Sequence, residues 1–379
     1  MCDKLNLKLP QISFDSNLVE LIMQLEVLRN QIAPLEINPR LFTQVKEIFH
    51  MIESLQSARI EGNRTTISDY VTYKFEENKE FENIKEIENI EIAINYVNTC
   101  FDEDKEFKIS NKFLKELHYL ITKGLKNEGS NESGSYRTCY VKINKAIYTP
   151  PNPTAVPGFM QELIEWINKD DKMQMQLLKV AIAHHCFTWI HPFDNGNGRM
   201  SRILTYSMLR QYGFDMAYLL NSTAVFCIDR NKYFEMLQVA DENTDESKAI
   251  WCEYVLSGLH KEMSKVSKLM NKQFFAERIV MPAINKALEL HFINNDYKKV
   301  LELALNKTEG IVKSKDVQGA LPEKTPRQIN LLITKMIELG LLQRTEPNAR
   351  TYVINLICKD LTRGIIETLY REQFISVEE

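Results

Sequence analysis

The sequence predicts a mainly α-helical protein, and three observations lead to that prediction. Apolar residues recur at helical spacing through most of the 379-residue chain. Glycine and proline are sparse, with 13 and 12 copies. Alternation typical of strands is confined to two short stretches. We therefore expect a helical core with one short β-hairpin, and nearer the C-terminus helices joined to a β-ribbon; the length suits two or three domains.

The composition is that of an ordinary globular protein, with 44% hydrophobic and 26% charged residues. The net charge of −4 argues against a general polyanion binder but is compatible with a local basic face. No apolar run approaches the roughly 18–20 residues that a membrane span requires, and residues 1–10 lack the core of a signal peptide. The seven cysteines are scattered without a Cys-x-x-Cys pair, so we expect free thiols, no zinc site and a cytoplasmic location.

The elements follow in order along the chain. Apolar side chains at helical spacing predict N-terminal helices over 16–32, 39–59 and 86–100, so residues 1–100 form a helical region. A core over 101–270 follows, with predicted helices at 111–124, 158–168, 174–190, 200–212 and 250–270. Between them, 136–143 and 146–149 are expected to pair as a β-hairpin around Asn144-Lys145.

The run from His191 to Arg202 carries the strongest chemical signal. Gly196-Asn197-Gly198 can bring backbone N–H groups close to an anion, because glycine tolerates left-handed geometry. A helix that starts at Gly198 or Arg199 would favour phosphate at its N-terminus. Arg199 and Arg202 would share a face of that helix, and each can fork onto phosphate oxygens. His191 titrates near neutral pH and suits a general base.

This run resembles the signature of the Fic family, His-Pro-Phe-x-(Asp/Glu)-Gly-Asn-Gly-Arg-x-x-Arg. Eight of its nine fixed positions match: His191, Pro192, Phe193, Gly196, Asn197, Gly198, Arg199 and Arg202. Fic proteins typically transfer AMP from ATP to a hydroxyl side chain of a target protein. The alternative interpretation is a turn between two helices with two solvated arginines.

The resemblance implies a role for each matching residue. His191 would deprotonate the target Ser, Thr or Tyr. The backbone of residues 196–198 would hold the α- and β-phosphates, Arg199 would contact the β/γ region, and Arg202 would contact the γ-phosphate. The acidic residue that usually helps to hold Mg²⁺ is here Asn195, with Asp194 beside it. An amide oxygen is a weaker ligand for Mg²⁺ than a carboxylate, so the departure bears on metal affinity more than on the reaction class.

A second run, Ser57-Ala-Arg-Ile-Glu-Gly62, resembles the inhibitory motif (Ser/Thr)-x-x-x-Glu-(Gly/Asn) of the same family. Ser57 and Glu61 are four residues apart on one helical face, and Gly62 is a natural helix stop. A carboxylate at a helix C-terminus is disfavoured by the dipole and benefits from a cationic partner. The resemblance implies that Glu61 pairs with Arg202 and occupies the γ-phosphate position. A solvated helix end is the alternative.

The resemblance also bears on three other features of the core. The 136–149 hairpin would be a flap along which the target protein lays an extended segment; a plain surface hairpin is the alternative. Arg137 matches a common family position and is otherwise a structural surface arginine. His184 is interpreted as structural support. Tyr233 is a candidate adenine contact, although core packing is slightly favoured for it.

The C-terminal region, 280–379, has a different character. Helices are predicted over 285–305, 312–321 and 327–339, the last with Leu339 among its inward residues, followed by strands at 341–345 and 351–355 and a tail. This order resembles a winged helix-turn-helix. DNA binding through 312–355 would use the outer face of the 327–339 helix, with Arg327, Gln328, Asn330 and Lys335. Protein contacts or self-assembly are the alternatives, since the charge there is only slightly positive.

The leading hypothesis is a protein adenylyltransferase that uses ATP and Mg²⁺, restrained by Glu61 and capable of self-AMPylation. A DNA-binding regulator with a nucleotide-sensing Fic-like core is the second. The third is an enzyme of the same core that removes AMP or transfers another nucleotide or phosphate group.

Overall fold

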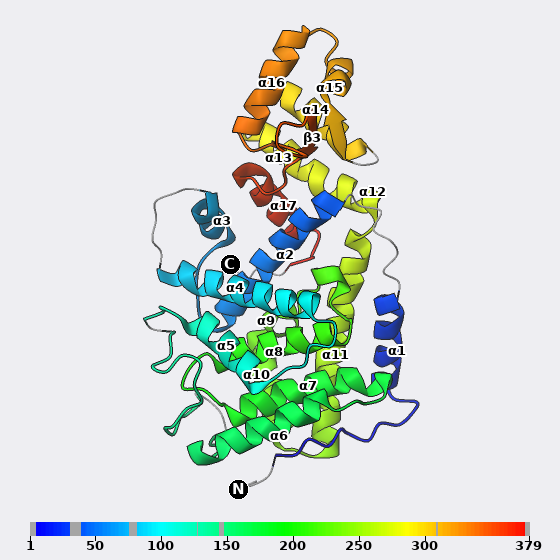
Figure 1. Cartoon of the computed structure of the whole chain (residues 1–379). Coiled ribbons are helices and arrows are strands. Elements are labelled where there is room, and N and C mark those ends of the chain that lie inside the picture. Colours follow the sequence, from blue (N-terminus) through cyan, green and yellow to red (C-terminus); the bar gives the residue numbers. More distant parts are fainter. Residues whose placement is uncertain are drawn as a thin grey trace. The chain divides into compact units, whose positions relative to one another are not determined.

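The computed structural model of the protein describes residues 5–30, 39–75, 82–126, 128–143, 148–307 and 310–375. The described chain is mostly helical, as predicted (Figure 1). Its contacts divide it into two compact units, each assembled from separate stretches of sequence. Unit 1 comprises residues 1–31, 50–65 and 80–264, and unit 2 comprises residues 32–49, 66–79 and 265–379. The linear domain limits 1–100, 101–270 and 280–379 stay a prediction.

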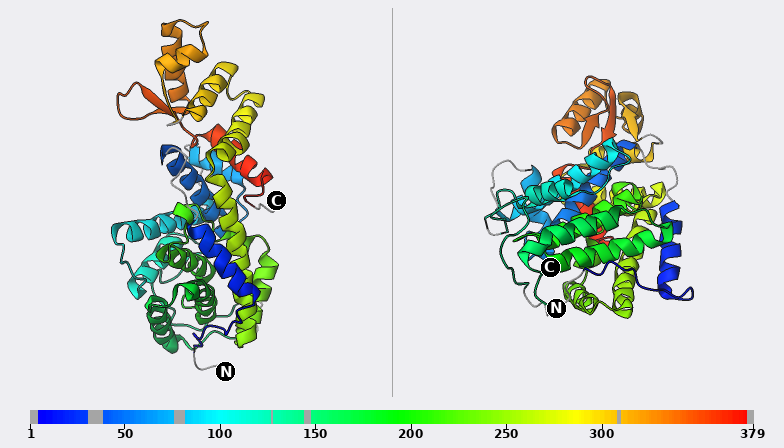
Figure 2. Two further views of the ribbon diagram at one scale, coloured as in Figure 1. Left: turned by 90° about the vertical axis from the view of Figure 1, so that its right-hand side faces the viewer. Right: turned by 60° about the horizontal axis from the view of Figure 1, so that its bottom comes forward.

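Unit 1 is helical and is built around α7. Its helices are α1 (Asn17–Asn30), α4 (Glu82–Glu103), α5 (Asn111–Thr122), α6 (Val156–Asn168), α7 (Met173–Ile190), α8 (Asn197–Gln211), α9 (Ala224–Cys227) and α10 (Arg230–Asp241), with short turns η1 (Pro153–Ala155) and η2 (Met216–Tyr218). Helices α2 (Pro39–Ile60) and α11 (Asp245–Leu269) contribute residues to both units. Helix α7 packs against α6 and α8, and α4 packs against α5 (Figures 1 and 2).

Helix α7 is buried on nearly all sides, because apolar residues occupy almost its whole circumference. A helix enclosed in this way cannot shift without disturbing the packing around it. The residues at its C-terminal end, beginning with His191, are therefore held in one place.

Two of the helices that carry the site begin at residues suited to that position. Ser110 caps α5, and its hydroxyl accepts the N–H of Phe113 at 3.1 Å. Gly196 precedes α8, which begins at Asn197, one residue earlier than the sequence analysis expected. Among the described residues, no helix is both long and apolar enough to cross a lipid bilayer.

Unit 2 contains a three-stranded antiparallel sheet with the order β1-β3-β2. Ile311 pairs with Val353, and Leu342 pairs with Ile354. Its elements are α3 (Ile67–Phe75), α12 (Lys272–Phe274), η3 (Phe275–Val280), α13 (Met281–Glu289), α14 (Asn295–Asn306), β1 (Ile311–Lys313), α15 (Ser314–Ala320), α16 (Pro326–Glu338), β2 (Leu342–Arg344), β3 (Thr351–Ile354) and α17 (Lys359–Arg371).

Several boundaries in unit 2 differ from the sequence prediction. The helix expected over 285–305 is divided into α13 and α14, because Asn294 caps a new helix by accepting the N–H of Tyr297 at 2.9 Å. The range 312–321 begins with β1 rather than with a helix, and α17 lies where a tail was expected. Leu339 was predicted to face inward but is 56% exposed, since it follows the last turn of α16.

The predicted β-hairpin is not found in the part of its range that the structure describes. Residues 136–143 and 148–149 carry no strand, and 144–147 lie outside the described residues. Instead of hydrogen bonds between paired strands, this segment has polar contacts of loop residues, such as those of Arg137 and Tyr148.

Candidate functional site

His191 lies directly after α7, where its backbone is fixed. Its φ of 48° is left-handed, and its N–H donates to the carbonyl of Phe187 at 3.0 Å. Nδ1 lies 3.3 Å from the carbonyl oxygen of Thr188, which favours a proton on Nδ1 and a lone pair on Nε2. Burial lowers the pKa of His191 to about 4, so at pH 7 the ring is neutral and can accept a proton.

The glycine turn is held by the asparagines on either side of Gly196. Asn197 Oδ1 accepts the N–H of Phe193, and its amide nitrogen donates to the carbonyl of the same residue, both at 2.9 Å. Asn195 Oδ1 accepts the N–H of Gly196 at 2.7 Å. Gly196 has φ +75°, which glycine adopts without strain. The turn therefore presents the N-terminus of the 15-residue helix α8, a place suited to an anion.

Glu61 occupies that place and forms an ion pair with Arg202. Arg202 Nη2 donates to Glu61 Oε1 at 2.7 Å and to the carbonyl of Ser57 at 3.0 Å, and Nε donates to Ser57 Oγ at 3.0 Å. A Cβ added at Gly198 would overlap Glu61 Oε1, so the carboxylate rests against the first turn of α8. Gly62 has φ +106°, just after α2 ends. The structure thus brings together the predicted inhibitory residues and Arg202.

Glu61 is charged in this arrangement, and one nitrogen of the Arg202 guanidinium makes no hydrogen bond within the described ranges. Burial by itself would raise the pKa of Glu61, but the guanidinium of Arg202 outweighs it and the pKa is lowered. Nη1 of Arg202 is buried and has no hydrogen-bond partner within the described ranges. This donor lies near Gly198, beside the carboxylate. The end of α8 therefore offers positive charge and a donor to a phosphate that replaces Glu61.

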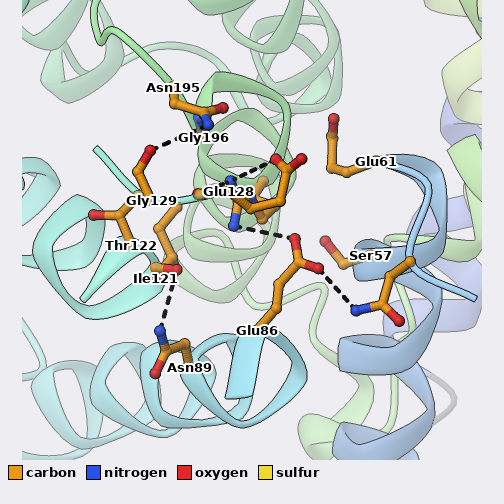
Figure 3. A network of polar contacts seen from close by, with 12 residues as sticks. Ser57, Glu61, Glu86, Asn89, Ile121, Thr122, Glu128, Gly129, Asn195 and Gly196 are labelled. Atoms are coloured by element: carbon orange, nitrogen blue, oxygen red, sulfur yellow. Dashed lines mark hydrogen bonds and ion pairs between the residues drawn. The ribbon is translucent and has the colours of Figure 1, made fainter. Parts of the chain in front are cut away.

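Arg199 is engaged elsewhere. Its Nη1 lies 3.1 Å from Glu86 Oε1, and its Nη2 donates to the carbonyl of Glu128 at 2.7 Å (Figure 3). A carboxylate oxygen of Glu128 lies 3.5 Å from the same nitrogen. The guanidinium is 1% exposed. The two arginines of the run thus have separate carboxylate partners, and the phosphate contact expected of Arg199 stays a prediction.

The side chains expected to hold Mg²⁺ are occupied by neighbouring groups. Asp194 accepts the hydroxyl of Ser130 and the backbone N–H groups of Asn131 and Asn195. The side-chain oxygen of Asn195 accepts the N–H of Gly196, and its side-chain amide nitrogen donates to the carbonyl of Gly129 at 3.1 Å (Figure 3). Across the described ranges, no group of three or more His, Cys, Asp or Glu side chains could hold a metal ion. These residues therefore do not fit a magnesium site as they stand.

A cavity of about 710 Å³ opens beside His191 and Arg202. Its size is that of a pocket for a nucleotide-sized ligand. Its lining includes residues of α10 and two residues of the 136–149 segment. The other lining residues are Glu61, Ile143, Tyr148, Thr188, Asn197, Gly198, Arg230, Asn231, Tyr233, Phe234, Glu235, Leu237, Gln238 and Asp241.

Tyr233 borders this cavity but is 2% exposed. Its hydroxyl lies 2.9 Å from Nε2 of His184, whose Nδ1 lies 2.8 Å from Thr205 Oγ1. Burial lowers the pKa of His184 well below its ordinary value, so His184 is a neutral core residue. Phe234 is 39% exposed and presents the more accessible ring to the cavity.

Arg137 is buried beside His191 and is not a surface residue. Its Nε donates to the carbonyl of His191 at 2.7 Å, and its Nη2 to the carbonyl of Pro151 at 2.7 Å. Its Nη1 donates to the carbonyl of Cys139 at 3.1 Å, and its backbone N–H to that of Pro192 at 2.9 Å. A cation is favourable at the C-terminus of α7. Arg137 therefore links the backbone of His191 to that of Cys139, in the predicted flap, and to that of Pro151, just after it.

His118, which no sequence motif indicated, contacts the glycine turn. Its ring stacks on Phe193 at a centroid distance of 3.7 Å and an interplanar angle of 4°. Nδ1 accepts the N–H of Gly134 at 2.9 Å, and Nε2 lies 3.1 Å from the carbonyl of Asn195. Burial lowers its pKa to about 4. A histidine on the apolar face of a helix was the only signal, and it did not reveal these partners.

Fold and site together define a class of helical proteins in which a histidine at the end of a buried helix lines the same cavity as the N-terminus of a second helix. Residues 108–209 match the model of the Fic/DOC family, and they form a Fic/DOC domain.

Known relatives agree with this assignment. The chain is 28% identical over 203 residues to "Protein adenylyltransferase Fic" of Culex quinquefasciatus, covering 52% of this chain and 37% of that protein. It is 28% identical over 221 residues to "Protein adenylyltransferase fic-1" of Caenorhabditis briggsae, covering 56% of this chain and 41% of that protein. The chain thus spans about two fifths of the length of these relatives.

Solved structures show the same fold. A Fic family protein from Desulfovibrio desulfuricans G20 matches with a TM-score of 0.57 at 20% identity, covering 92% of this chain and 98% of that chain. Fic-1 from C. elegans matches with a TM-score of 0.53 at 20% identity, covering 68% of this chain and 73% of that chain.

Proposed function

We propose that the protein transfers AMP from ATP to a hydroxyl side chain of a target protein, and that Glu61 restrains this activity. The observation that carries the proposal is the position of the Glu61 carboxylate on Arg202, at the N-terminus of α8 and beside the cavity that His191 lines. An acidic side chain held in a nucleotide-sized cavity at an anion site occupies the place of a phosphate. The curated relatives named as protein adenylyltransferases support the reaction class.

The chemistry assigned to this chain begins with His191. Its neutral ring takes the proton of the target hydroxyl at Nε2 while the hydroxyl oxygen bonds to the α-phosphorus of ATP. The bond from the α-phosphorus to the bridging oxygen breaks, pyrophosphate leaves, and the proton passes from His191 to solvent. The N–H groups at the start of α8 and the guanidinium of Arg202 stabilise the phosphate charge.

Glu61 opposes this reaction by competition. Both its carboxylate and the γ-phosphate require Arg202, and two negative groups a few ångströms apart in a buried site repel each other. ATP therefore binds either after Glu61 has left or with its phosphates displaced from the line of attack. The target segment would lie along residues 136–149, which border the cavity through Ile143 and Tyr148.

Labelled ATP tests the function directly. Wild-type protein, Glu61→Gly and Glu61→Gly/His191→Ala are incubated with ATP labelled at the α- or γ-phosphate, and label on the chain itself or on lysate proteins is counted. We expect α-label to rise at least about tenfold in Glu61→Gly, and to vanish in the double variant. Transfer of γ-label would instead show phosphoryl transfer. Equal labelling of wild type and Glu61→Gly would refute autoinhibition by Glu61.

A second proposal concerns unit 2. We infer that residues 295–354 form a winged helix, because α14, β1, α15, α16, β2 and β3 follow in that order with the two last strands paired. The side chains of α16 predicted for the outer face, Arg327, Gln328, Asn330 and Lys335, are all exposed. We propose that this face contacts nucleic acid. Binding of duplex DNA by the full chain should weaken with salt and with Arg327→Ala/Lys335→Ala; no binding at low salt would favour a protein partner.

A further inference from the structure

A buried carboxylate, that of Glu86, connects the segment just after Glu61 to the run from His191 to Arg202. Glu86, on α4, is 4% exposed. Its Oε2 accepts the side-chain amide of Asn63 at 2.8 Å, and its Oε1 lies 3.1 Å from Arg199 Nη1. Asn63 is the second residue after Glu61. In Figure 3 the Glu86 side chain lies between Glu128 and the C-terminal end of α2, where Ser57 and Glu61 are labelled.

Asn63 is well suited to fix the chain beyond Glu61. Its amide nitrogen also donates to the carbonyl of Asn83 at 2.7 Å, and its Oδ1 accepts the N–H of Thr65 at 3.0 Å. Its own N–H donates to the carbonyl of Ala58 at 3.1 Å. Glu61 follows the last residue of α2, and the next residue is a left-handed glycine. The contacts of Asn63 therefore restrain a short segment that would otherwise be free to move.

The charges around Glu86 make its position sensitive to Arg199. Burial raises the pKa of Glu86, Arg199 and the hydrogen bond from Asn63 lower it, and the carboxylates of Glu128 and Glu61 raise it; the net shift is upward. Glu86 therefore depends on Arg199 for its charge balance. A buried carboxylate that loses its cationic partner is strongly destabilised.

We propose that Glu86 is a positioning residue of the autoinhibited state, which holds Asn63 and Arg199 at once and thereby keeps Glu61 on Arg202. The inference rests on the proposed function and assigns a second acidic residue to its regulation. When a phosphate draws Arg199 away, Glu86 loses its counter-charge and takes up a proton from solvent, so its charge-assisted hydrogen bond from Asn63 becomes a weaker neutral one and Glu61 is released from Arg202. The two arginines are thereby coupled, and the coupling acts in both directions.

Substitution of Asn63 tests this without touching the nucleotide site. Asn63→Asp places a second carboxylate against Glu86, and Asn63→Ala removes the amide contact. We expect Asn63→Asp to raise α-label transfer about threefold to tenfold over wild type, and Asn63→Ala to raise it less. A gain of activity cannot come from misfolding. Glu88→Gln, on the same helix and half-exposed, is the matched control and should behave as wild type.

The background of Glu61→Gly separates this mechanism from a general loosening of the site. With Glu61 absent, Asn63→Asp should have no further effect, because the residue that it releases is no longer there. Unchanged transfer by Asn63→Asp while Glu61→Gly is activated would overturn the proposal, as would an equal gain in both backgrounds.

A binding measurement keeps the inference separate from the proposed reaction. Titration calorimetry with α,β-methylene-ATP should show tighter binding to Asn63→Asp than to wild type, since Arg202 is more often available. If no variant transfers label but this affinity rises, the proposed reaction fails and the role of Glu86 stands. If label is transferred but neither rate nor affinity responds to Asn63, the role of Glu86 fails.

Discussion

The carboxylate of Glu61 lies against Gly198, in the space that the Cβ of any other residue would occupy. The same glycine lies in the first turn of α8, so one small volume serves the inhibitory carboxylate and the phosphate that is proposed to replace it. Glycine at this position therefore has a reason in packing, separate from the conformational freedom that Gly196 requires at φ +75°.

Gly198→Ala should therefore affect both the Glu61 carboxylate and the phosphate that is proposed to bind in its place. The methyl group displaces Glu61 from Arg202, and we expect unfolding in urea to show a loss of about 1–3 kcal/mol. In Glu61→Gly the loss should be smaller, since the methyl no longer meets the carboxylate. In that background transfer should fall at least about tenfold, because the phosphate needs the same space. Full activity of Glu61→Gly/Gly198→Ala would place the phosphates elsewhere.

Arg137 should be required for rate more than for nucleotide binding. Its guanidinium donates to the carbonyls of His191, Pro151 and Cys139, and a lysine cannot reproduce this fork. In Glu61→Gly we expect Arg137→Lys to lower kcat about tenfold or more with a small change in KM for ATP. Lys142→Ala, an exposed change on the same segment, is the control. A rise in KM with unchanged kcat would assign Arg137 to nucleotide binding.

The value of kcat/KM for transfer should not fall near pH 6.5, where an ordinary histidine base becomes protonated. Burial lowers the pKa of His191 to about 4, and the Glu61 carboxylate raises it slightly, so in Glu61→Gly the pKa falls further. A base with a low pKa stays unprotonated as the pH decreases. We expect kcat/KM of Glu61→Gly to stay level from pH 8 to pH 5. An inflection between pH 6 and 7 would show that the free enzyme holds His191 in a more solvated position.

The same shifts predict how His118 affects stability. Its folded pKa, about 4, lies below its ordinary value of 6.5, so the unfolded chain binds more protons between these pH values. Folding free energy from this group is therefore fully present above pH 6.5 and decreases toward pH 4, by about 1.4 kcal/mol per pH unit. Glu53, whose pKa burial raises to about 7, changes stability in the opposite sense. Urea unfolding of wild type and His118→Gln at pH 7 and pH 5 should show a smaller pH effect in the variant; equal effects would contradict the assignment.

Sequence alone located the helices of unit 1 well, because their signals are local. The period of apolar residues and the stops at Gly62 and Gly124 gave α2 and α5 close to their observed limits. In the C-terminal region, the break between α13 and α14 lies where His291 has a left-handed φ of 60° and Asn294 caps the next helix. Such a cap competes with helix continuation by a small free energy, so periodicity did not reveal it.

Site residues that belong to a sequence motif could be predicted from the sequence. Their contacts with residues from distant segments of the chain could not. His191, Arg202 and Glu61 were named from two short runs, and the structure brings them together. The partners of Arg199 were not foreseen, because the helical pattern over 86–100 does not indicate what Glu86 contacts and Glu128 lies outside any predicted element. A surplus of acidic residues on a helix normally indicates a solvated face, and only the fold shows that Glu86 is buried.

We expect Asp194 to stabilise the turn at Gly196 and not to act as a ligand of any Mg²⁺ that the reaction uses. Burial by itself would raise the pKa of Asp194, but the hydroxyl of Ser130 and the N–H groups of Asn131 and Asn195 outweigh it, and the pKa is lowered. Its contribution to stability is therefore present at pH 7 and is lost as the pH falls below the ordinary aspartate value of 3.8. We expect Asp194→Asn to lower the free energy of unfolding at pH 7 by about 1–2 kcal/mol. The Mg²⁺ concentration for half-maximal transfer in Glu61→Gly should stay within about twofold, well under the tenfold that a lost ligand commonly costs. A tenfold rise in that concentration with unchanged stability would instead make Asp194 a metal ligand, and would require the 129–131 segment to release it when nucleotide binds.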